Sequence, residues 1–392
     1  MSSTDPHPFD TLTLETLRAR PCIKWTHYDS DVLPLWVADM DFPTADPIAE
    51  ALAERARSGN LGYPAGYLNG EAGLPEALLG WLGTRHGWQL TVDDIWPIHG
   101  IIPGLYLGAL ACASAGEGVL LQTPLYPPFM SAVNDTGRKA QYSPLVWSGT
   151  RWEMDFVGLE ATITPETRLL MICNPHNPTG RVWSREELER LAEIALKHRL
   201  WILSDELHAD LVYPGHKHIP FASLSDEVAQ RTITLLGPTK SFNIAGLKIG
   251  FLITQNPELR ARLKRLGSGL VTPPNAMAQT AARAAYEAGG AWLESTLGYL
   301  KTNRDRVTQF VHDYLPEAQY APAEGTYLSW LDLRALSLGE GLNERLLKSG
   351  VGLNDGPPYG PGGEGFARLN FATTRAIVEE ALGRMRKGLE LG

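Results

Sequence analysis

Three segments of the chain carry side chains that could do chemistry, and each follows a short apolar run. They are Asn174-Pro-His-Asn-Pro-Thr-Gly180, Asp205-Glu-Leu-His208 and Gly237-Pro-Thr-Lys240. A lysine such as Lys240, whose neighbours partly desolvate its amine, can form a Schiff base with a carbonyl compound. Taken singly, Lys240 reads as a surface lysine and Asp205 as a turn or helix cap. Three such segments on successive strands predict a common site instead.

The elements that must position these segments alternate between strand and helix. Five short apolar runs, bounded by Pro, Gly, Asn or Asp, are typical of strands covered on both faces: Val119–Gln122, Leu169–Cys173, Trp201–Leu203, Thr232–Leu236 and Phe251–Ile253. Between the second and third runs, Ser184 and Glu187 can form a capping box ahead of apolar residues at helical spacing. A strand, a helix and a strand in this order predict a right-handed parallel crossover. In such sheets, ligands bind beyond the carboxyl ends of the strands.

The pattern changes after about Tyr286. Apolar residues from Leu293 to Tyr314 mark one face of a long helix ended by Pro316, and a Gly/Pro-rich loop runs from Gly352 to Gly365. We therefore predict an α/β protein with a large domain, residues 48–285, whose mostly parallel sheet is sandwiched by helices. Residues 1–47 and 286–392 are expected to form a smaller α+β domain.

Composition limits the classes of partner. The 392 residues suffice for two domains, or for one large domain with a smaller appendage. A hydrophobic fraction of 44% and a charged fraction of 20% are those of ordinary globular proteins. The net charge of −9 is interspersed, and we see no basic stripe of the kind that nucleic acid needs. Nucleic acid is therefore not an expected partner.

The cysteines and the N-terminus bear on location. Cys22, Cys112 and Cys173 are far apart and lack metal-ligand spacing, so we expect reduced thiols in the cytoplasm and no metal site. The segment Met1–Asp10 is polar and predicts no signal peptide. No uncharged apolar stretch reaches the ~18 residues that a membrane span needs. The sequence thus predicts a soluble, cytoplasmic protein.

The three segments resemble motifs of a known family. Asn-Pro-x-Asn-Pro-Thr-Gly from Asn174, Ser-Asp-Glu-x-His from Ser204 and x-Pro-x-Lys-x-Phe-Asn-x-Ala-Gly-Leu from Gly237 are similar to those of the fold-type I pyridoxal 5'-phosphate (PLP) enzymes of the class I/II aminotransferase superfamily. Leu35-Trp-Val-Ala-Asp-Met-Asp-Phe-Pro43 and Thr123-Pro-Leu-Tyr-Pro-Pro-Phe129 resemble its cystathionine β-lyase, or cysteine-S-conjugate β-lyase, branch. The resemblance runs from about residue 25 to the C-terminus.

This resemblance implies a role for each residue that would meet the cofactor ring. Lys240 would hold PLP as a Schiff base and, once released, would shuttle protons at the substrate Cα. Asp205 would pair with the pyridinium nitrogen and make the ring an electron sink. Asn177 would hydrogen-bond the phenolic oxygen of the ring and also face the substrate. Tyr126 would stack on the ring.

The resemblance also implies a phosphate site. The backbone N–H groups of Gly100, Ile101 and Ile102, at the start of an apolar helix-like stretch, would bind the anion. Thr239 would add a hydroxyl. Lys248 lies where many aminotransferases have an arginine that binds the phosphate. A lysine there would replace the two hydrogen bonds of a guanidinium by the single charge of an ammonium group.

Further residues are expected to bind the substrate or to come from a second subunit. Arg368 matches an arginine that grips the substrate α-carboxylate, for which a bidentate guanidinium is suited. Trp36 to Asp39, with Ala38 among them, would line the substrate entrance. Tyr63 matches a cofactor-binding tyrosine that relatives contribute from a partner subunit, which implies a homodimer with shared active sites.

The reaction type stays open between alternatives. His208 is expected at the cofactor, where many aminotransferases place a tyrosine that bonds the phenolic oxygen; a histidine there resembles the β-lyase branch. Together with the segment from Trp36 to Phe42, it favours cleavage of cystathionine or another cysteine S-conjugate. An amino-acid aminotransferase is the alternative, because the same residues serve both reactions. A PLP-binding regulatory protein is a third reading, without a helix-turn-helix or basic appendage to support it. A dinucleotide-dependent oxidoreductase is disfavoured, because no Gly-x-Gly-x-x-Gly follows a strand.

Overall fold

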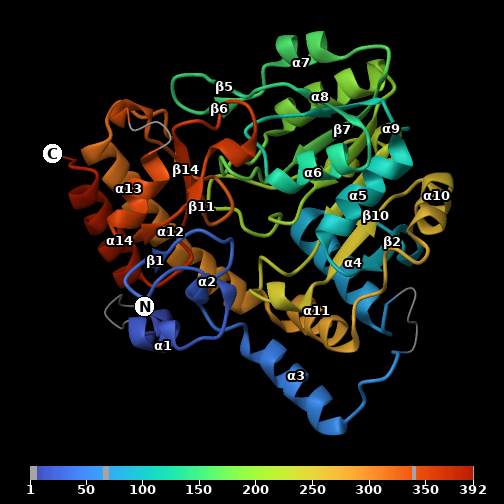
Figure 1. Ribbon diagram of the computed structural model, residues 1–392. Coiled ribbons are helices and arrows are strands. Elements are labelled where there is room, and N and C mark those ends of the chain that lie inside the picture. Colours follow the sequence, from blue (N-terminus) through green and yellow to red (C-terminus); the bar gives the residue numbers. More distant parts are fainter. Residues whose placement is uncertain (1–6, 65–69, 338–340, 392) are drawn as a thin grey trace.

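The computed structural model describes residues 7–64, 70–337 and 341–391. Residues 1–6, which belong to the segment predicted to carry no signal peptide, lie outside the described residues, as do 65–69, 338–340 and 392. Figure 1 shows a central sheet flanked by helices and, beside it, a smaller unit built from the two ends of the chain. The predicted α/β class with a second, smaller domain is confirmed.

The central sheet has seven strands and is mostly parallel, as predicted. β10 is antiparallel to both of its neighbours, β2 and β9, whereas the other neighbouring pairs are parallel. All five apolar runs singled out in the sequence form strands of this sheet. Its order is β2 (Ile95–Ile98), β10 (Gly250–Ile253), β9 (Thr232–Leu236), β8 (Trp201–Asp205), β7 (Thr167–Cys173), β3 (Gly118–Leu121) and β4 (Lys139–Tyr142).

The strands are apolar throughout because helices cover both faces of the sheet. Along β7, Leu169 and Met171 face a core shared with α5 (Ile101–Cys112), α6 (Pro127–Asp135) and α10 (Pro257–Gly267). Leu170 and Ile172 face the opposite core, shared with α7 (Phe156–Thr162) and α8 (Arg185–Lys197). The remaining helices of this part are α3 (Asp46–Ser58), α4 (Leu74–His86), α9 (Asp226–Ala229) and α11 (Ala276–Ala288).

The predicted crossover is confirmed in α8, which joins the parallel neighbours β7 and β8. Ser184 caps the helix: its hydroxyl accepts from the Glu187 N–H at 3.2 Å, and the Glu187 carboxylate accepts from the Ser184 N–H at 2.8 Å. Both halves of the predicted capping box are therefore present, and they satisfy two N–H groups at the helix start.

The smaller unit joins the two ends of the chain. β1 (Leu33–Pro34) pairs in parallel with β12 (Val351–Gly352), and α12 (Gly290–Tyr314) is the predicted long helix. Buried side chains of α4 and α12 belong to one continuous core cluster, so the limits at residues 48 and 285 stay a prediction. The other elements of the smaller unit are α1 (Leu14–Arg18), α2 (Ile23–Thr26), α13 (Leu342–Lys348), α14 (Arg375–Gly388) and the antiparallel sheet of β11 (Leu328–Asp332), β14 (Phe366–Asn370) and β13 (Asn354–Asp355). The hairpin of β5 (Val146–Trp147) and β6 (Trp152–Glu153) lies between β4 and α7 in the chain, and Trp152 belongs to the core of α7 and α8.

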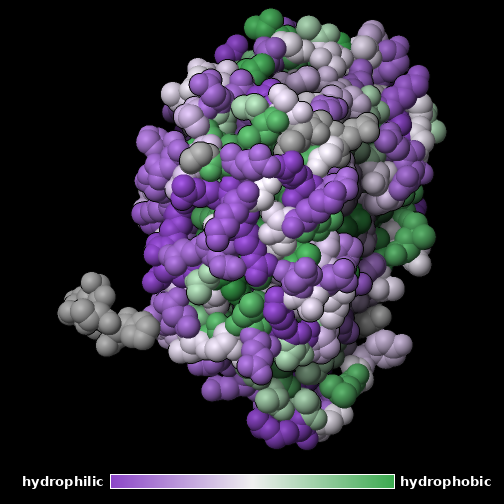
Figure 2. Space-filling view, turned by 60° about the vertical axis from the view of Figure 1, so that its left-hand side comes forward, coloured by the Kyte–Doolittle hydropathy of each residue, from purple (hydrophilic) through white to green (hydrophobic). Residues whose placement is uncertain are grey.

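The surface is mixed. On the face shown in Figure 2, hydrophilic residues predominate and apolar residues lie in small groups. None of the helices that the structure describes is long and apolar enough to cross a bilayer. The three cysteines carry free thiols, and Cys112 and Cys173 are buried.

Candidate active site

A pocket of about 380 Å³ opens beyond the carboxyl ends of β7, β8 and β9. Its volume is that of a typical small-molecule site. The three segments predicted to share a site each contribute to its wall, as do the start of α5 and the N-terminal segment. Of the predicted site residues, the lining includes Ala38, Gly100, Ile101, Ile102, Tyr126, Asn177, Asp205, His208, Thr239, Lys240 and Lys248.

Lys240 presents its amine to the pocket from the loop after β9. Its Nζ donates to the Ala38 carbonyl at 2.5 Å. The pKa of Lys240 is lowered to about 8, mainly by burial; the charge of Arg368 acts in the same direction, while Asp39 and Asp205 oppose it. A large fraction of this lysine is therefore neutral near pH 8, so the amine can act as a nucleophile or a base.

Asp205 ends β8 and lines the same pocket. One carboxylate oxygen, Oδ1, accepts from the Leu207 N–H at 3.0 Å. Burial raises the pKa of Asp205 to about 7, although the Leu207 hydrogen bond and the charge of Lys240 oppose the change. Because the chain stabilises the ionised form of this carboxyl group so little, a cation that enters the pocket would stabilise it strongly.

Asn177 and Arg368 form a pair that the sequence did not reveal. Arg368 donates from Nη1 to Asn177 Oδ1 at 3.1 Å and from Nη2 to the Trp36 carbonyl at 3.0 Å. Because arginine can only donate, the contact fixes the orientation of the Asn177 amide, so its NH₂ group remains as the donor. Arg368 lies behind Asn177 and is not among the lining residues, and its buried Nε has no partner within the described structure.

The start of α5 forms one wall with the geometry of an anion site. Gly100 precedes the helix at φ +121°, a conformation that favours glycine, and no side chain caps the helix. A Cβ at Gly100 would meet nothing within 4 Å, so open space lies beside the first N–H groups of the helix. Thr239 and Lys248 line the pocket as well. Lys248 is exposed.

His208 and Tyr126 complete the wall. Burial lowers the pKa of His208 to about 3, with Lys240 and Arg368 acting in the same direction, so the imidazole is neutral at physiological pH. Its Nδ1 is buried without a partner among the described atoms. Tyr126 directly precedes α6, and burial raises the pKa of its hydroxyl. Both rings can therefore contact a ligand without carrying charge.

Two predicted site residues do not line the pocket: Arg368, which lies behind Asn177, and Tyr63. Tyr63 is 85% exposed. Conversely, sequence reasoning missed Tyr327, whose hydroxyl donates to the Ala38 carbonyl at 3.0 Å. No motif marks that tyrosine, and a position just before β11 carries no signal of chemistry.

Comparison with known proteins is consistent with this geometry. The chain matches the family model described as aminotransferase class I and II over residues 30–385. Cystathionine beta-lyase PatB of Bacillus subtilis (strain 168) is 40% identical over 367 residues, which are 92% of this chain and 93% of that protein. Cystalysin from Treponema denticola, whose crystal structure contains pyridoxal 5'-phosphate, matches with a TM-score of 0.92 at 30% identity and covers 98% of this chain and 99% of its own. The PLP-bound C-S lyase from Staphylococcus hominis matches with a TM-score of 0.89 at 32% identity, over 98% of this chain and 99% of its own.

Proposed function

The chain belongs to the class I and II aminotransferase family, and we propose that it is a PLP-dependent carbon–sulfur β-lyase. Its substrate is cystathionine or another cysteine S-conjugate, and its products are a thiol, pyruvate and ammonia. The observation that carries the proposal is one pocket that holds an amine of lowered pKa on Lys240 and a buried carboxyl group of raised pKa on Asp205. The names of PatB and of the Staphylococcus hominis C-S lyase support the reaction type, and cystalysin supports the cofactor.

The residues present fit PLP on observations of this chain alone. Asp205 needs a cationic partner, which a protonated pyridine nitrogen supplies. The open space beside Gly100 and the uncapped start of α5 suit a phosphate. The Asn177 amide presents donors, as a phenolic oxygen requires. These groups would hold the cofactor, with Thr239 and Lys248 adding contacts to the phosphate and Tyr126 covering the ring.

The chain's own groups then perform the reaction. PLP, when bound, supplies an electron sink that stabilises negative charge at the substrate Cα. We expect Arg368, which lies directly behind Asn177, to orient the α-carboxylate, and its unpartnered Nε is the donor that supports this role. The neutral Lys240 amine takes the Cα proton and returns a proton to the departing sulfur, which leaves with the electron pair of the Cβ–S bond. His208 stays neutral throughout and packs in the pocket wall.

A second candidate, an amino-acid aminotransferase, begins with the same proton transfer and differs in the fate of the carbanion. His208, where many aminotransferases carry a tyrosine, favours the lyase. The test is incubation of the purified protein with cystathionine, with cystine, and with alanine plus a keto acid, with pyruvate, thiol and transaminated product measured together. We expect pyruvate and thiol in equal amounts. Stoichiometric transfer to the keto acid without pyruvate would overturn the lyase proposal, and a yellow protein that turns over none of them would indicate a regulatory protein.

The proposal includes a cytoplasmic homodimer with shared sites. The exposed Tyr63 supports it, because it lies outside its own chain's pocket, and the free thiols support a reducing compartment. Mixed subunits test it. Neither Tyr63→Phe nor Lys240→Ala homodimers should be fully active, but re-assembled mixtures should regain activity, since one of the two sites in a mixed dimer is intact. A monomer by light scattering would contradict the dimer.

A further inference from the structure

Every carbonyl of residues 36–39 is held by a side chain. Arg368 donates to the Trp36 carbonyl at 3.0 Å, and the Asn370 amide donates to those of Val37 and Asp39, each at 2.7 Å. The buried Lys24 adds a second bond to the Asp39 carbonyl at 3.0 Å. The backbone of this segment is therefore fixed on both sides of Ala38, which leaves the direction of one carbonyl to be set.

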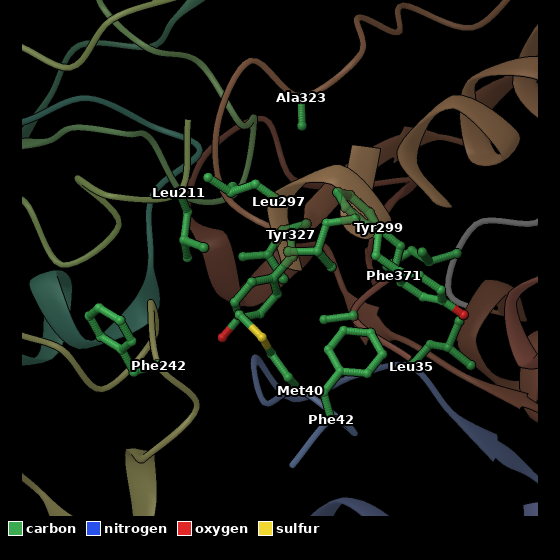
Figure 3. Packing of buried hydrophobic residues seen from close by; sticks show 14 of the residues in the cluster. Leu35, Met40, Phe42, Leu211, Phe242, Leu297, Tyr299, Ala323, Tyr327 and Phe371 are labelled. Carbon is green, nitrogen blue, oxygen red and sulfur yellow. The ribbon is translucent and has the colours of Figure 1, made fainter. Parts of the chain in front are cut away.

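The Ala38 carbonyl accepts two hydrogen bonds, one from the loop after β9 and one from the residue before β11. One donor is Lys240 Nζ at 2.5 Å and the other is the Tyr327 hydroxyl at 3.0 Å. Tyr327 is 1% exposed. Figure 3 shows its ring beside Met40, among buried residues from both ends of the chain. The centroids of the Tyr327 and His208 rings are 6.0 Å apart in an edge-to-face arrangement.

The residue before Tyr327 has a strained backbone conformation. Thr326 has φ +68°, which is a strained conformation for a β-branched residue. Three hydrogen bonds hold it there: its N–H donates to Leu211, its carbonyl accepts from the Tyr213 hydroxyl, and its Oγ1 accepts from the Leu328 N–H, at 2.7, 2.8 and 3.1 Å. Strain retained in this way is common next to functional side chains.

We propose that Tyr327 is a positioning residue for Lys240. Its hydroxyl sets the direction of the Ala38 carbonyl, and that carbonyl receives the ε-amine whenever Lys240 is not covalently bound. The inference deepens the proposed function, on which its kinetic part rests. Burial raises the pKa of Tyr327 well above its ordinary value, so the hydroxyl remains a donor throughout the working range of pH.

The consequence for catalysis follows from placement. To transfer a proton, the amine of Lys240 must lie within hydrogen-bonding distance of the substrate Cα. Small displacements of a catalytic group from such a position slow proton transfer strongly. Tyr327 does not contact Arg368 through a hydrogen bond given by the structure, so carboxylate binding does not depend on it. Tyr327→Phe keeps the ring and loses about 1 kcal/mol of hydrogen bonding, so it should fold.

The first measurement is the split of kcat against KM for pyruvate formation by the holoenzyme. We expect Tyr327→Phe to lower kcat by about 10-fold to 100-fold and to leave KM within about twofold. Tyr299→Phe is the matched control: Tyr299 is also buried and its hydroxyl donates to Asp10 at 2.5 Å, in the smaller unit away from the pocket. The control should keep kcat. Equal loss in both variants would show a merely structural role.

The second measurement does not depend on turnover. Only a neutral amine adds to an aldehyde, so the rate at which PLP recombines with the cofactor-free chain, followed by absorbance against pH, reports the titration of Lys240. The ammonium gains more than the amine from a well-directed carbonyl, so the midpoint should move to lower pH in Tyr327→Phe. Asp39, Asp205 and Arg368, the charged groups that face Lys240, are unchanged in the variant.

An unchanged midpoint, together with a kcat like that of Tyr299→Phe, would overturn the proposal. The two inferences can fail separately. If the wild-type protein formed no pyruvate, the β-lyase assignment would fail, whereas the recombination midpoint would still decide the role of Tyr327, because it requires only that PLP adds to Lys240.

Discussion

Asp205 and Glu206 are neighbours at the end of β8, both buried, yet they face different surroundings. Asp205 lines the large pocket and accepts one backbone hydrogen bond. Glu206 lines a separate cavity of about 10 Å³ behind it and accepts from Ser204 Oγ, the Phe221 N–H and His218 Nε2, at 2.8, 2.9 and 2.9 Å. Glu206 thus has three hydrogen-bond donors from the protein, whereas Asp205 has one.

A second buried carboxylate outside the pocket, that of Asp210, is also fully paired within the protein. Asp210 accepts from Trp81 and pairs with His86 and Arg85, at 3.0, 3.0 and 3.2 Å. Buried charges that serve the fold are paired in this manner. The difference teaches how to recognise a ligand site: burial shifts the pKa values of Asp205 and Lys240 towards their neutral forms, and the chain supplies them with few partners to oppose it.

The comparison is tested most strongly by activity. Asp205→Asn should lower kcat/KM by about 10³-fold, roughly 4 kcal/mol, because the neutral amide cannot keep a ring nitrogen protonated. Pyruvate release from cystathionine measures the effect. Glu206→Gln, one residue away, should lose less than about tenfold per folded molecule. Equal losses would mean that both carboxylates serve the cofactor and that the division proposed between them is wrong.

Stability against pH should separate the same two residues in the cofactor-free protein. The pKa of Asp205 is raised from 3.8 to about 7 by burial, so its contribution to the free energy of unfolding is fully present below about pH 4 and is lost as the pH rises to about 7. The loss is at most about 4 kcal/mol. Asp205→Asn should lack it, so that in urea the variant matches the wild type near pH 4 and exceeds it above pH 7. Added PLP should remove that advantage, since the wild-type carboxylate then has a partner.

Glu206→Gln should have the opposite effect on stability. Removing the charge leaves His218 and two further donors with a poorer acceptor, and breaking a buried pair of this kind costs about 3 kcal/mol. Urea unfolding at neutral pH measures it, with Glu193→Gln on the exposed side of α8 as the control expected to change little. A Glu206→Gln protein as stable as that control would show that the network behind β8 contributes nothing to the fold.

The sequence could predict the pocket side of this comparison, since apolar runs reveal where strands end and the residues that follow parallel strands meet at one edge. Lys240 and Asp205 were accessible in this way, whereas the Gly100 turn, which follows the antiparallel strand β2, was implied only by the family resemblance. Contacts between distant parts of the chain were not: Asn177 and Arg368 are 191 positions apart, and Ala38 and Tyr327 are 289 apart. No periodicity or motif encodes which carbonyl a distant hydroxyl will reach.

The smallest expected effect concerns the two lysines of the pocket. Lys240 is partly buried, whereas Lys248 is exposed, so the attraction of Lys248 for a phosphate is screened by water and salt. Lys248→Met should therefore weaken PLP binding by about tenfold, about 1.4 kcal/mol, and leave kcat unchanged at saturating cofactor. Equilibrium titration of the cofactor-free chain measures this, with Lys197→Met, at an exposed lysine of α8, as the control.

Salt sharpens the result for Lys248. If the charge acts through solvent, the difference in affinity between Lys248→Met and the wild type should shrink as the ionic strength rises. A loss of about 100-fold that persists in high salt would contradict a solvent-exposed contact. It would mean that another surface, such as that of the second subunit, covers Lys248 in the assembled protein.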